Sequence, residues 1–561
     1  MSDPRAALAV TDSAETVGSA SALAAARSVR LAQIAVVAFA GLACLAVALA
    51  FVVPAISALV PAFFSGETGP AKGLSRVSYA LRFTLVQAAF SSLAAVVLGI
   101  PAAFLVAKRE FPGRRLLLAS SGVPLCVPPV IIALAFVLFY GRQGYLNAVL
   151  MALTGAREPP VTFLYSLAGL VIAHGFYNFP VVMRTVSRVW ERIPETEEDA
   201  ARLLGASEPR VFLTVTAPHL SGAILSSGAL VFLYCFFSFV IVLLFGGIGG
   251  TTLEVELYQA ARSSLDFRLA GTIALVETAL ALCVVALYRG LESRLSAGAT
   301  GFASPVPRVP VRSGAEAAGA FAFLAFLAVF FAGPLLSVLV RSFTPTGARF
   351  GDFSLSAWRF LASRGGFFPA LASTVAVSLA SAGLATVAAL FLALAAGKRD
   401  RAGLSAVALV PLAVSSVMLS FGWNLVVPRG NGATLAFAQA AVSWPFAWTQ
   451  VRSALARVPR SVDDAAALLS PRRLDATFRV RLPLVARGAL AGFALSFAIG
   501  AGDATLPVTL SLGGFENLSL MLFRLAGSYR FPEACACAVV LASLSALVFL
   551  AQDAEVGDGR A

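Results

Sequence analysis

Two segments of the chain share a hydroxyl residue, an acid three positions later and two alanines directly after the acid. The matched residues lie 265 positions apart: Thr196, Asp199, Ala200 and Ala201 in the first segment, and Ser461, Asp464, Ala465 and Ala466 in the second. A hydroxyl three residues before an acid is the capping-box spacing that starts a helix, and the helix dipole favours an acid in the first turn. The pattern predicts a short helix in each segment. In the first, Leu203 and Leu204 form an apolar pair that suits docking into a groove on a partner.

A second group of residues consists of polar side chains inside apolar runs, where they are costly and point to function. Asp503 stands between glycines and Pro507, a composition that predicts a broken helix lining a cavity. Its equivalent 265 positions earlier is Ser238. We expect both to face a pathway between two halves of the protein, with a helix-packing hydrogen bond as the alternative. Glu277 is expected to be either a pathway acid or the buried partner of an arginine.

Asn178 is a further candidate for the pathway, and it lies one helical turn after His174. A metal site would need more ligands than this pair, and the other histidine, His219, falls in a loop. We therefore interpret His174 as a packing residue and predict no metal site.

The composition predicts the elements that position these residues. Of 561 residues, 59% are hydrophobic and 13% are charged, which is about half the charged share of a soluble domain. The apolar runs are continuous, as spanning helices require, and do not alternate as in a membrane barrel. The net charge of +13 comes from arginines clustered in alternate loops, the positive-inside pattern of a membrane protein rather than a nucleic-acid patch. The predicted fold class is an all-α polytopic membrane protein.

Counting apolar runs predicts about twelve transmembrane helices in two sets of six. The first set is 31–61, 79–106, 116–140, 162–183, 222–246 and 268–288, and the second is 318–340, 371–396, 404–427, 433–451, 486–512 and 533–552. The second helix of each set matches at an offset of 290, and later segments match at 265. Six spans return each half to its starting side, so the halves are expected to be parallel repeats.

The same pattern predicts the domain order. We expect a cytoplasmic N-terminal tail at 1–30, a six-helix domain at 31–289, a cytoplasmic linker of no fixed structure at 290–317, a second six-helix domain at 318–552, and a C-terminal tail at 553–561. The basic loops place both termini and both acid-Ala-Ala segments in the cytoplasm.

The two segments resemble the signature loop of ABC importer permeases, in which Gly follows acid-Ala-Ala after three residues and an aliphatic residue and Leu-Pro come later. The first copy continues with Gly205 and Pro218, and the second with Ser470 and Pro483. The resemblance covers nearly the whole chain and includes the fused, duplicated form. It implies the type I importer permease fold in a bacterial inner membrane. It also implies a role in ATPase coupling for these four residues and for the hydroxyl, acid and alanine residues of the two segments: Thr196, Asp199, Ala200, Ala201, Ser461, Asp464, Ala465 and Ala466.

This resemblance also implies the partners, which are two copies of a cytoplasmic ABC ATPase, an extracytoplasmic substrate-binding protein and membrane lipid. A nucleotide-binding Gly-x-x-x-x-Gly-Lys-Ser/Thr loop cannot be built on Lys72, Lys108 or Lys398, the three lysines of the chain. We therefore expect the chain to be a transport subunit that is not itself an enzyme and binds no cofactor. ATP and magnesium would be held by the ATPase.

The cargo is indicated by segments 140–146, 173–180, 251–260 and 527–530, which resemble thiamine-importer permeases. Thiamine or its phosphates is the first expectation, and ferric iron is the alternative. An ion-coupled secondary transporter is a rival of a different class, because it would also use two repeats and intramembrane acids.

Two departures from the family pattern matter. Both copies carry Asp where the family usually has Glu, and the second copy has Ser470 where the first has Gly205. Because glycine readily ends a helix in the left-handed conformation and serine does so less well, we predict that the two short helices end differently.

Overall fold

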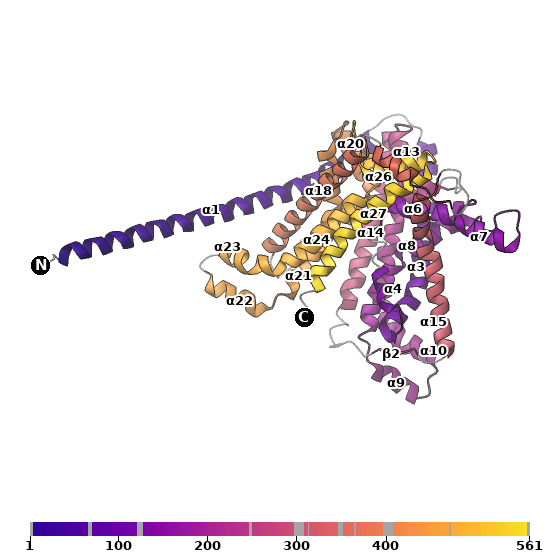
Figure 1. Ribbon diagram of the computed structural model, residues 1–561, viewed down its shortest axis with the longest axis horizontal. Coiled ribbons are helices and arrows are strands. Elements are labelled where there is room, and N and C mark those ends of the chain that lie inside the picture. The colour runs from indigo at the N-terminus through magenta and orange to yellow at the C-terminus, as the bar shows by residue number, and fades with distance from the viewer. Residues whose placement is uncertain are drawn as a thin grey trace.

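A computed structural model describes residues 4–64, 70–120, 127–245, 250–296, 308–311, 314–345, 352–363, 366–396, 408–470 and 473–557, nearly all of them helical (Figure 1). The long helices are α1 (Pro4–Leu59), α3 (Pro70–Lys108), α6 (Pro129–Tyr140), α8 (Leu167–Trp190), α11 (Ala217–Phe236), α14 (Phe267–Ser296), α15 (Gly314–Leu327), α16 (Gly333–Ser342), α18 (Phe367–Ala396), α20 (Ser416–Val426), α21 (Gly432–Arg457), α24 (Leu482–Gly502) and α27 (Phe531–Gly557). The shorter ones are α2 (Pro61–Phe64), α4 (Arg114–Ser120), α7 (Tyr145–Thr154), α9 (Glu195–Leu203), α10 (Glu208–Val211), α12 (Val240–Phe245), α13 (Leu253–Arg262), α17 (Ser356–Ser363), α22 (Arg460–Leu469), α23 (Arg473–Ala476), α25 (Thr505–Thr509) and α26 (Leu518–Gly527).

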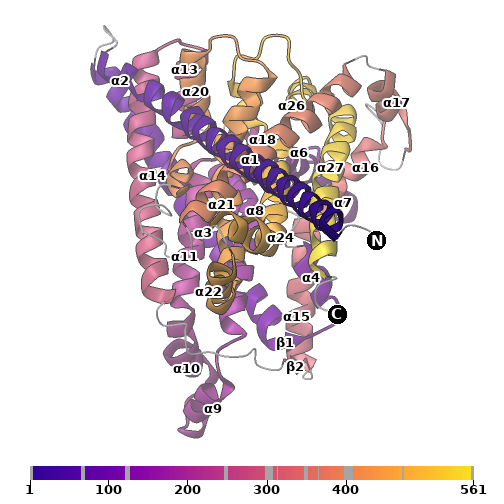
Figure 2. The same ribbon diagram turned by 90° about the vertical axis from the view of Figure 1, so that its left-hand side faces the viewer.

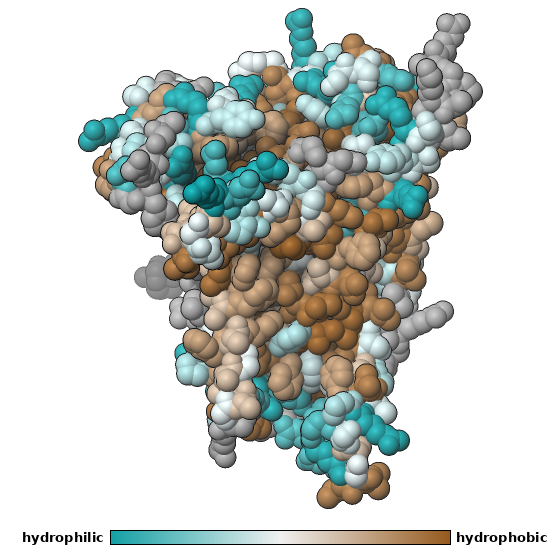
Figure 3. Space-filling model, turned by 90° about the vertical axis from the view of Figure 1, so that its right-hand side faces the viewer, coloured by the Kyte–Doolittle hydropathy of each residue, from teal (hydrophilic) through white to brown (hydrophobic). Residues whose placement is uncertain are grey.

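Within the described ranges, nine helical segments are long and apolar enough to cross a membrane. Figure 3 shows the matching surface, with a broad apolar belt between two more polar ends. The predicted class of all-α polytopic membrane protein is therefore confirmed.

The three other expected spans correspond to α8, α20 and α21. Helices α8 and α21 are long enough, but they bury polar side chains, among them Asn178 in α8 and Gln439 and Ser443 in α21. More than half of the residues of each helix are buried, so these helices need less of a lipid-like composition. Helix α20 is short because the residues before it form a 3-10 turn, Val410–Ala413.

Two of the expected spans are broken at equivalent positions. Helix α11 ends at Phe236 and α12 starts at Val240, while α24 ends at Gly502 and α25 starts at Thr505. The broken helix predicted around Asp503 is thus confirmed, and Ser238 lies in the equivalent break. The expected span 116–140 begins its long helix only at Pro129, where a proline in the first turn loses no helical hydrogen bond.

Each half contributes its first helix to the other half. Helix α1 packs against α18, α20 and α21 of the second half, and it crosses in front of that half in Figure 2. In return, α16 packs against α6 of the first half. Aromatic rings also connect the two halves. Phe330 of the second half stacks on Tyr140 of the first, and Phe331 contacts Phe179 edge to face. The halves are therefore interlocked rather than laid side by side.

The segments expected to be the two tails and the linker contain helix, and the linker also contains a short strand. The backbone of residues 4–30 is helical and continuous with α1, consistent with its many alanines and with the absence of proline from 5 to 53. Helix α27 runs on to Gly557. In the linker, β2 (Val309–Pro310) pairs in parallel with β1 (Arg109–Glu110), and α15 already starts at Gly314, so the expectation of no fixed structure is wrong for these residues. Residues 297–307 lie outside the described ranges.

Figure 1 shows how the halves are arranged. They meet at the end that holds α13, α20 and α26, and they diverge toward α9 in the first half and α22 in the second. The two acid-Ala-Ala segments thus lie at the diverging ends of the halves.

Candidate coupling site

The acid-Ala-Ala segments form the helices α9 and α22, as predicted, but prolines and not hydroxyls start them. Pro194 and Pro459 are the N-cap residues, with φ near −62° and −61°, and neither helix has a side-chain cap. Thr196 and Ser461 lie one residue inside the first turn, so the capping-box prediction is wrong. Because a proline cannot continue the preceding helix, the helices start two residues earlier than a hydroxyl cap would allow. The first-turn acids are then Glu195, Glu197 and Glu198 in α9 and Asp463 in α22, and Asp199 and Asp464 fall in the next turn.

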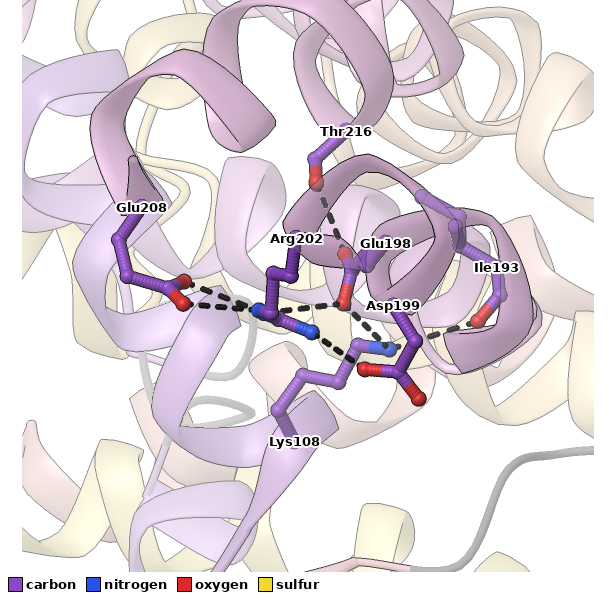
Figure 4. A network of polar contacts seen from close by, with 7 residues as sticks. All are labelled: Lys108, Ile193, Glu198, Asp199, Arg202, Glu208 and Thr216. Carbon is purple, nitrogen blue, oxygen red and sulfur yellow. Dashed lines mark hydrogen bonds and ion pairs between the residues drawn. The ribbon is translucent and has the colours of Figure 1, made fainter. Parts of the chain in front are cut away.

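The residue that holds α9 against the protein is Glu198 (Figure 4). Its carboxylate is buried and accepts a hydrogen bond of 2.8 Å from the Thr216 hydroxyl. The Lys108 ammonium, at the end of α3, lies 3.8 Å from the other carboxylate oxygen and donates to the Ile193 carbonyl at 3.4 Å. Glu198 therefore connects α9 both to a spanning helix and to the segment that leads into α11.

Asp199 points the other way, toward solvent. Its side chain is 61% exposed and pairs with Arg202 at 2.8 Å. Arg202 also donates to Glu208 at 2.7 Å, and this hydrogen bond raises the pKa of Arg202 and lowers that of Glu208. These ion pairs are exposed and screened by water, so they shape the surface of α9 rather than hold it in place.

The second half repeats this anchor with different chemistry. The equivalent of Glu198 is Asp463, and the equivalent of Thr216 is Arg481. Arg481 donates to Asp463 at 3.1 Å, and the Asp463 side chain is 13% exposed. A hydroxyl donor in one half is therefore replaced by a guanidinium in the other. Lys398, which matches Lys108 at the offset of 290, lies outside the described residues.

Sequence reasoning missed Glu198, Asp463, Thr216 and Arg481. The signal was present, since an acid occupies both members of the pair Glu198 and Asp463. Both donors are the last residues of π turns, Phe212–Thr216 and Thr477–Arg481, and each lies two residues before a proline, Pro218 or Pro483. A proline ring clashes with the carbonyl four residues earlier, so the helix widens there. This is the structural role of the two signature prolines.

The outer tips of α9 and α22 are apolar. Leu203 and Leu204 are 89% and 90% exposed, and the equivalent Leu468 and Leu469 are 86% and 85% exposed. The predicted apolar pair of α9 is confirmed, and α22 repeats it.

The two helices end differently, which confirms the prediction drawn from Gly205 and Ser470. Gly205 has φ of +85°, and Ala206 N–H donates back to the Ala201 carbonyl at 3.1 Å. Ser470 is extended, with φ of −89° and ψ of 128°. The chain therefore leaves α9 through a tight left-handed turn, whereas α22 ends at a residue in extended conformation.

The polar residues predicted for a pathway occupy different environments. The Ser238 hydroxyl is bound by His174 at 2.8 Å, and Asn178 donates to the His174 carbonyl at 2.9 Å. These bonds match the alternative of helix packing for Ser238, and they agree with a packing role for His174. Asp503 instead lines a cavity of about 200 Å³ to which both halves contribute.

Glu277 is buried in α14, and its neighbour is an acid rather than the arginine considered from the sequence. Glu254 of α13, outside the nine candidate spans, lies against Glu277, next to Ser415 of the second half. Burial raises the pKa of Glu254 well above its ordinary value, and the Glu277 carboxyl raises it further. Glu277 does not line the cavity at Asp503.

Comparison with known proteins identifies the family. A model of the binding-protein-dependent transport system inner membrane component matches residues 95–297 and again 384–554. The thiamine transport system permease protein of Brucella abortus (strain 2308) is 28% identical over 495 residues, covering 84% of this chain and 86% of the relative. Its counterpart in Escherichia coli (strain K12) is 26% identical over 490 residues, covering 84% and 88%.

A half-length relative is also similar. The putative 2-aminoethylphosphonate transport system permease protein of Salmonella typhi is 35% identical over 215 residues, covering 38% of this chain and 74% of the relative. One family match lies in each half of the fold, and the two matches include α9 and α22, as the resemblance to ABC importer permeases implied. The chain thus belongs to the family of binding-protein-dependent transport system inner membrane components and carries the domain of that family twice.

Proposed function

We propose that this chain carries thiamine or its phosphates across the inner membrane, driven by a separate ABC ATPase and supplied by an extracytoplasmic binding protein. The diverging ends with α9 and α22 face the cytoplasm, as do both termini, and one ATPase copy docks on each of these helices. ATP and magnesium are held by the ATPase. The observation that carries the proposal is the repeat of a short helix with an exposed leucine pair in both halves.

The leucine pairs supply the docking energy. Each leucine that becomes fully buried contributes about 1.5–3 kcal/mol, so a pair is sufficient to anchor a helix in an apolar groove on the ATPase. The neighbouring surface is charged, with Asp199 and Arg202 exposed beside the pair on α9, and this rim orients the partner.

The buried acids transmit the movement. Glu198 ties α9 to α3 and to the segment before α11, and Asp463 ties α22 to the segment before α24. A rigid connection of this kind moves the spanning helices when ATP closes the ATPase dimer, so that the halves rock between outward and inward access. The site residues proposed for coupling are therefore the signature residues together with Glu198, Asp463, Thr216 and Arg481.

Thiamine is the first choice of cargo because relatives named for thiamine transport match 84% of this chain. The Salmonella relative favours 2-aminoethylphosphonate as a second candidate, and ferric iron remains the alternative expected from sequence. Thiamine and 2-aminoethylphosphonate share a positively charged nitrogen.

The test is ATP hydrolysis and uptake in liposomes that contain this chain, its candidate ATPase and a candidate thiamine-binding protein. We expect ATP-dependent thiamine uptake that is lost when Leu203, Leu204, Leu468 and Leu469 are changed to Ser. The control is Leu153→Ser, because Leu153 is 78% exposed on α7, away from both short helices. Uptake that proceeds without any ATPase would overturn the proposal in favour of an ion-coupled transporter.

A further inference from the structure

The cavity between the halves has walls of unequal chemistry. Tyr177 and Pro128 line it from the first half, and Gln439, Gly500 and Asp503 line it from the second. Its volume of about 200 Å³ lies below the ~300–1,000 Å³ of ordinary small-molecule pockets. The space therefore suits one charged ring or ammonium group rather than a whole drug-sized molecule.

Among the polar side chains that line this space, Gln439 and Asp503 keep hydrogen-bond acceptor capacity. Gln439 is 2% exposed, and its side-chain oxygen has no hydrogen-bond partner among the residues that the structure describes. Its amide nitrogen donates to the Gly500 carbonyl at 2.8 Å, and the Gln439 side chain also hydrogen-bonds to the Asp503 carboxyl. The Asp503 carboxylate accepts from the Thr505 N–H at 2.9 Å and from the Leu506 N–H at 3.3 and 3.4 Å, which leaves acceptor capacity on a group with about four lone-pair sites.

No lysine, arginine or histidine is among the described residues that line the cavity. Tyr177 brings an aromatic ring to the lining, and aromatic rings attract cations. A carboxyl group at membrane depth is costly to ionise, and a cation in the cavity would lower that cost.

The first half has residues equivalent to Gln439, Asp503 and their neighbour Ser381, but their hydrogen bonding is different. Ser91, His174 and Ser238 are the equivalents of Ser381, Gln439 and Asp503, at the offsets of 290 and 265. In the first half they bond to one another, with His174 joined to Ser238 at 2.8 Å and to Ser91 at 3.4 Å. Both sets are internally bonded, since Gln439 also interacts with Asp503. They differ in that the second-half set carries a carboxyl group and an amide oxygen with no hydrogen-bond partner among the described residues.

We propose that the cavity at Asp503 is a cation-binding site in the translocation pathway, where Asp503 and the Gln439 oxygen receive the positively charged group of the solute. This inference rests on the proposed function and narrows its cargo to solutes with a cationic ring or ammonium group. The thiazolium ring of thiamine, which bears a permanent positive charge, has the required chemistry. The site is one-sided, because the equivalent set of the first half carries no carboxyl group.

The first experiment tests the site without relying on transport. Saturation-transfer NMR of the full-length purified chain compares 3,4-dimethylthiazolium with neutral 4-methylthiazole. We expect stronger transfer to the cation, and a loss of that preference in Asp503→Asn, which keeps an acceptor for the Thr505 N–H. Gln439→Leu should weaken cation binding as well. The matched control is Ser238→Ala, which should leave the preference for the cation unchanged.

The second experiment measures thiamine uptake in the reconstituted system. In Asp503→Asn the cationic group of the solute loses its charged partner, so thiamine uptake by this variant should fall by about tenfold or more. The binding protein should still stimulate the ATPase. Equal binding of the cation and the neutral ring, or an unchanged preference in Asp503→Asn, would overturn the site. If the wild-type protein prefers the cation but does not transport thiamine, the proposed cargo fails and the cation site stands.

Discussion

Replacing Lys108 with Met tests whether Glu198 anchors α9. The Lys108 and Glu198 side chains are only 7% and 11% exposed. Removing one partner of a fully buried ion pair costs about 3–5 kcal/mol, because the other charge stays behind unpaired. Here the charges are 3.8 Å apart, the Thr216 hydrogen bond remains, and Arg202 lies 4.0 Å from the same carboxylate. We therefore expect a smaller cost of about 2 kcal/mol, which raises local opening of α9 about 30-fold.

The assay is hydrogen exchange of the amides of α9 in the purified full-length chain. The double variant Lys108→Met with Glu198→Gln removes both charges but keeps an acceptor for Thr216, so it should lose less than about 1 kcal/mol. Arg202→Met is the control, because this exposed arginine should contribute less than about 1 kcal/mol. An increase in exchange below about threefold for Lys108→Met, or a double variant as open as the single one, would refute the anchor.

The remaining predictions concern the helix end and the buried acids. Gly205→Ala places a side chain in the left-handed region and should destabilise the end of α9 by about 1–2 kcal/mol. Ser470→Ala changes a residue in an extended conformation and should cost less than about 0.5 kcal/mol. Hydrogen exchange of the amides at the end of each helix measures both effects. For Glu254, a folded-state pKa above the ordinary 4.5 means that the folded protein holds a proton that the unfolded chain releases. The contribution of Glu254 to stability is therefore complete below pH 4.5 and is lost as pH rises through the raised pKa. Melting temperatures in detergent should fall over that range in the wild-type protein and fall less in Glu254→Gln; an equal fall in both would contradict the raised pKa.

Much of the site was predictable because it depends on local pattern. The offset of 265 paired α9 with α22, and the exchange of Gly205 for Ser470 predicted their different ends, since a left-handed turn depends on the residue at that position. The break at Asp503 followed from its glycines and Pro507. Which acid anchors α9, Asp199 or Glu198, could not be predicted in this way. Consecutive helix residues point about 100° apart, and only the packing of α9 against the rest of the protein shows which side chain faces inward.

The sequence alone therefore determined the membrane class, the duplication and the two short helices, because apolar run length, repeat spacing and turn chemistry are properties of neighbouring residues. Only the tertiary structure decided that α1 lies against the second half, that Glu198 rather than Asp199 meets Lys108, and that Ser238 is bonded while Asp503 faces a cavity. These outcomes depend on contacts between residues far apart in the chain. The physical reason is that burial and pairing of a polar group are set by which other helix faces it.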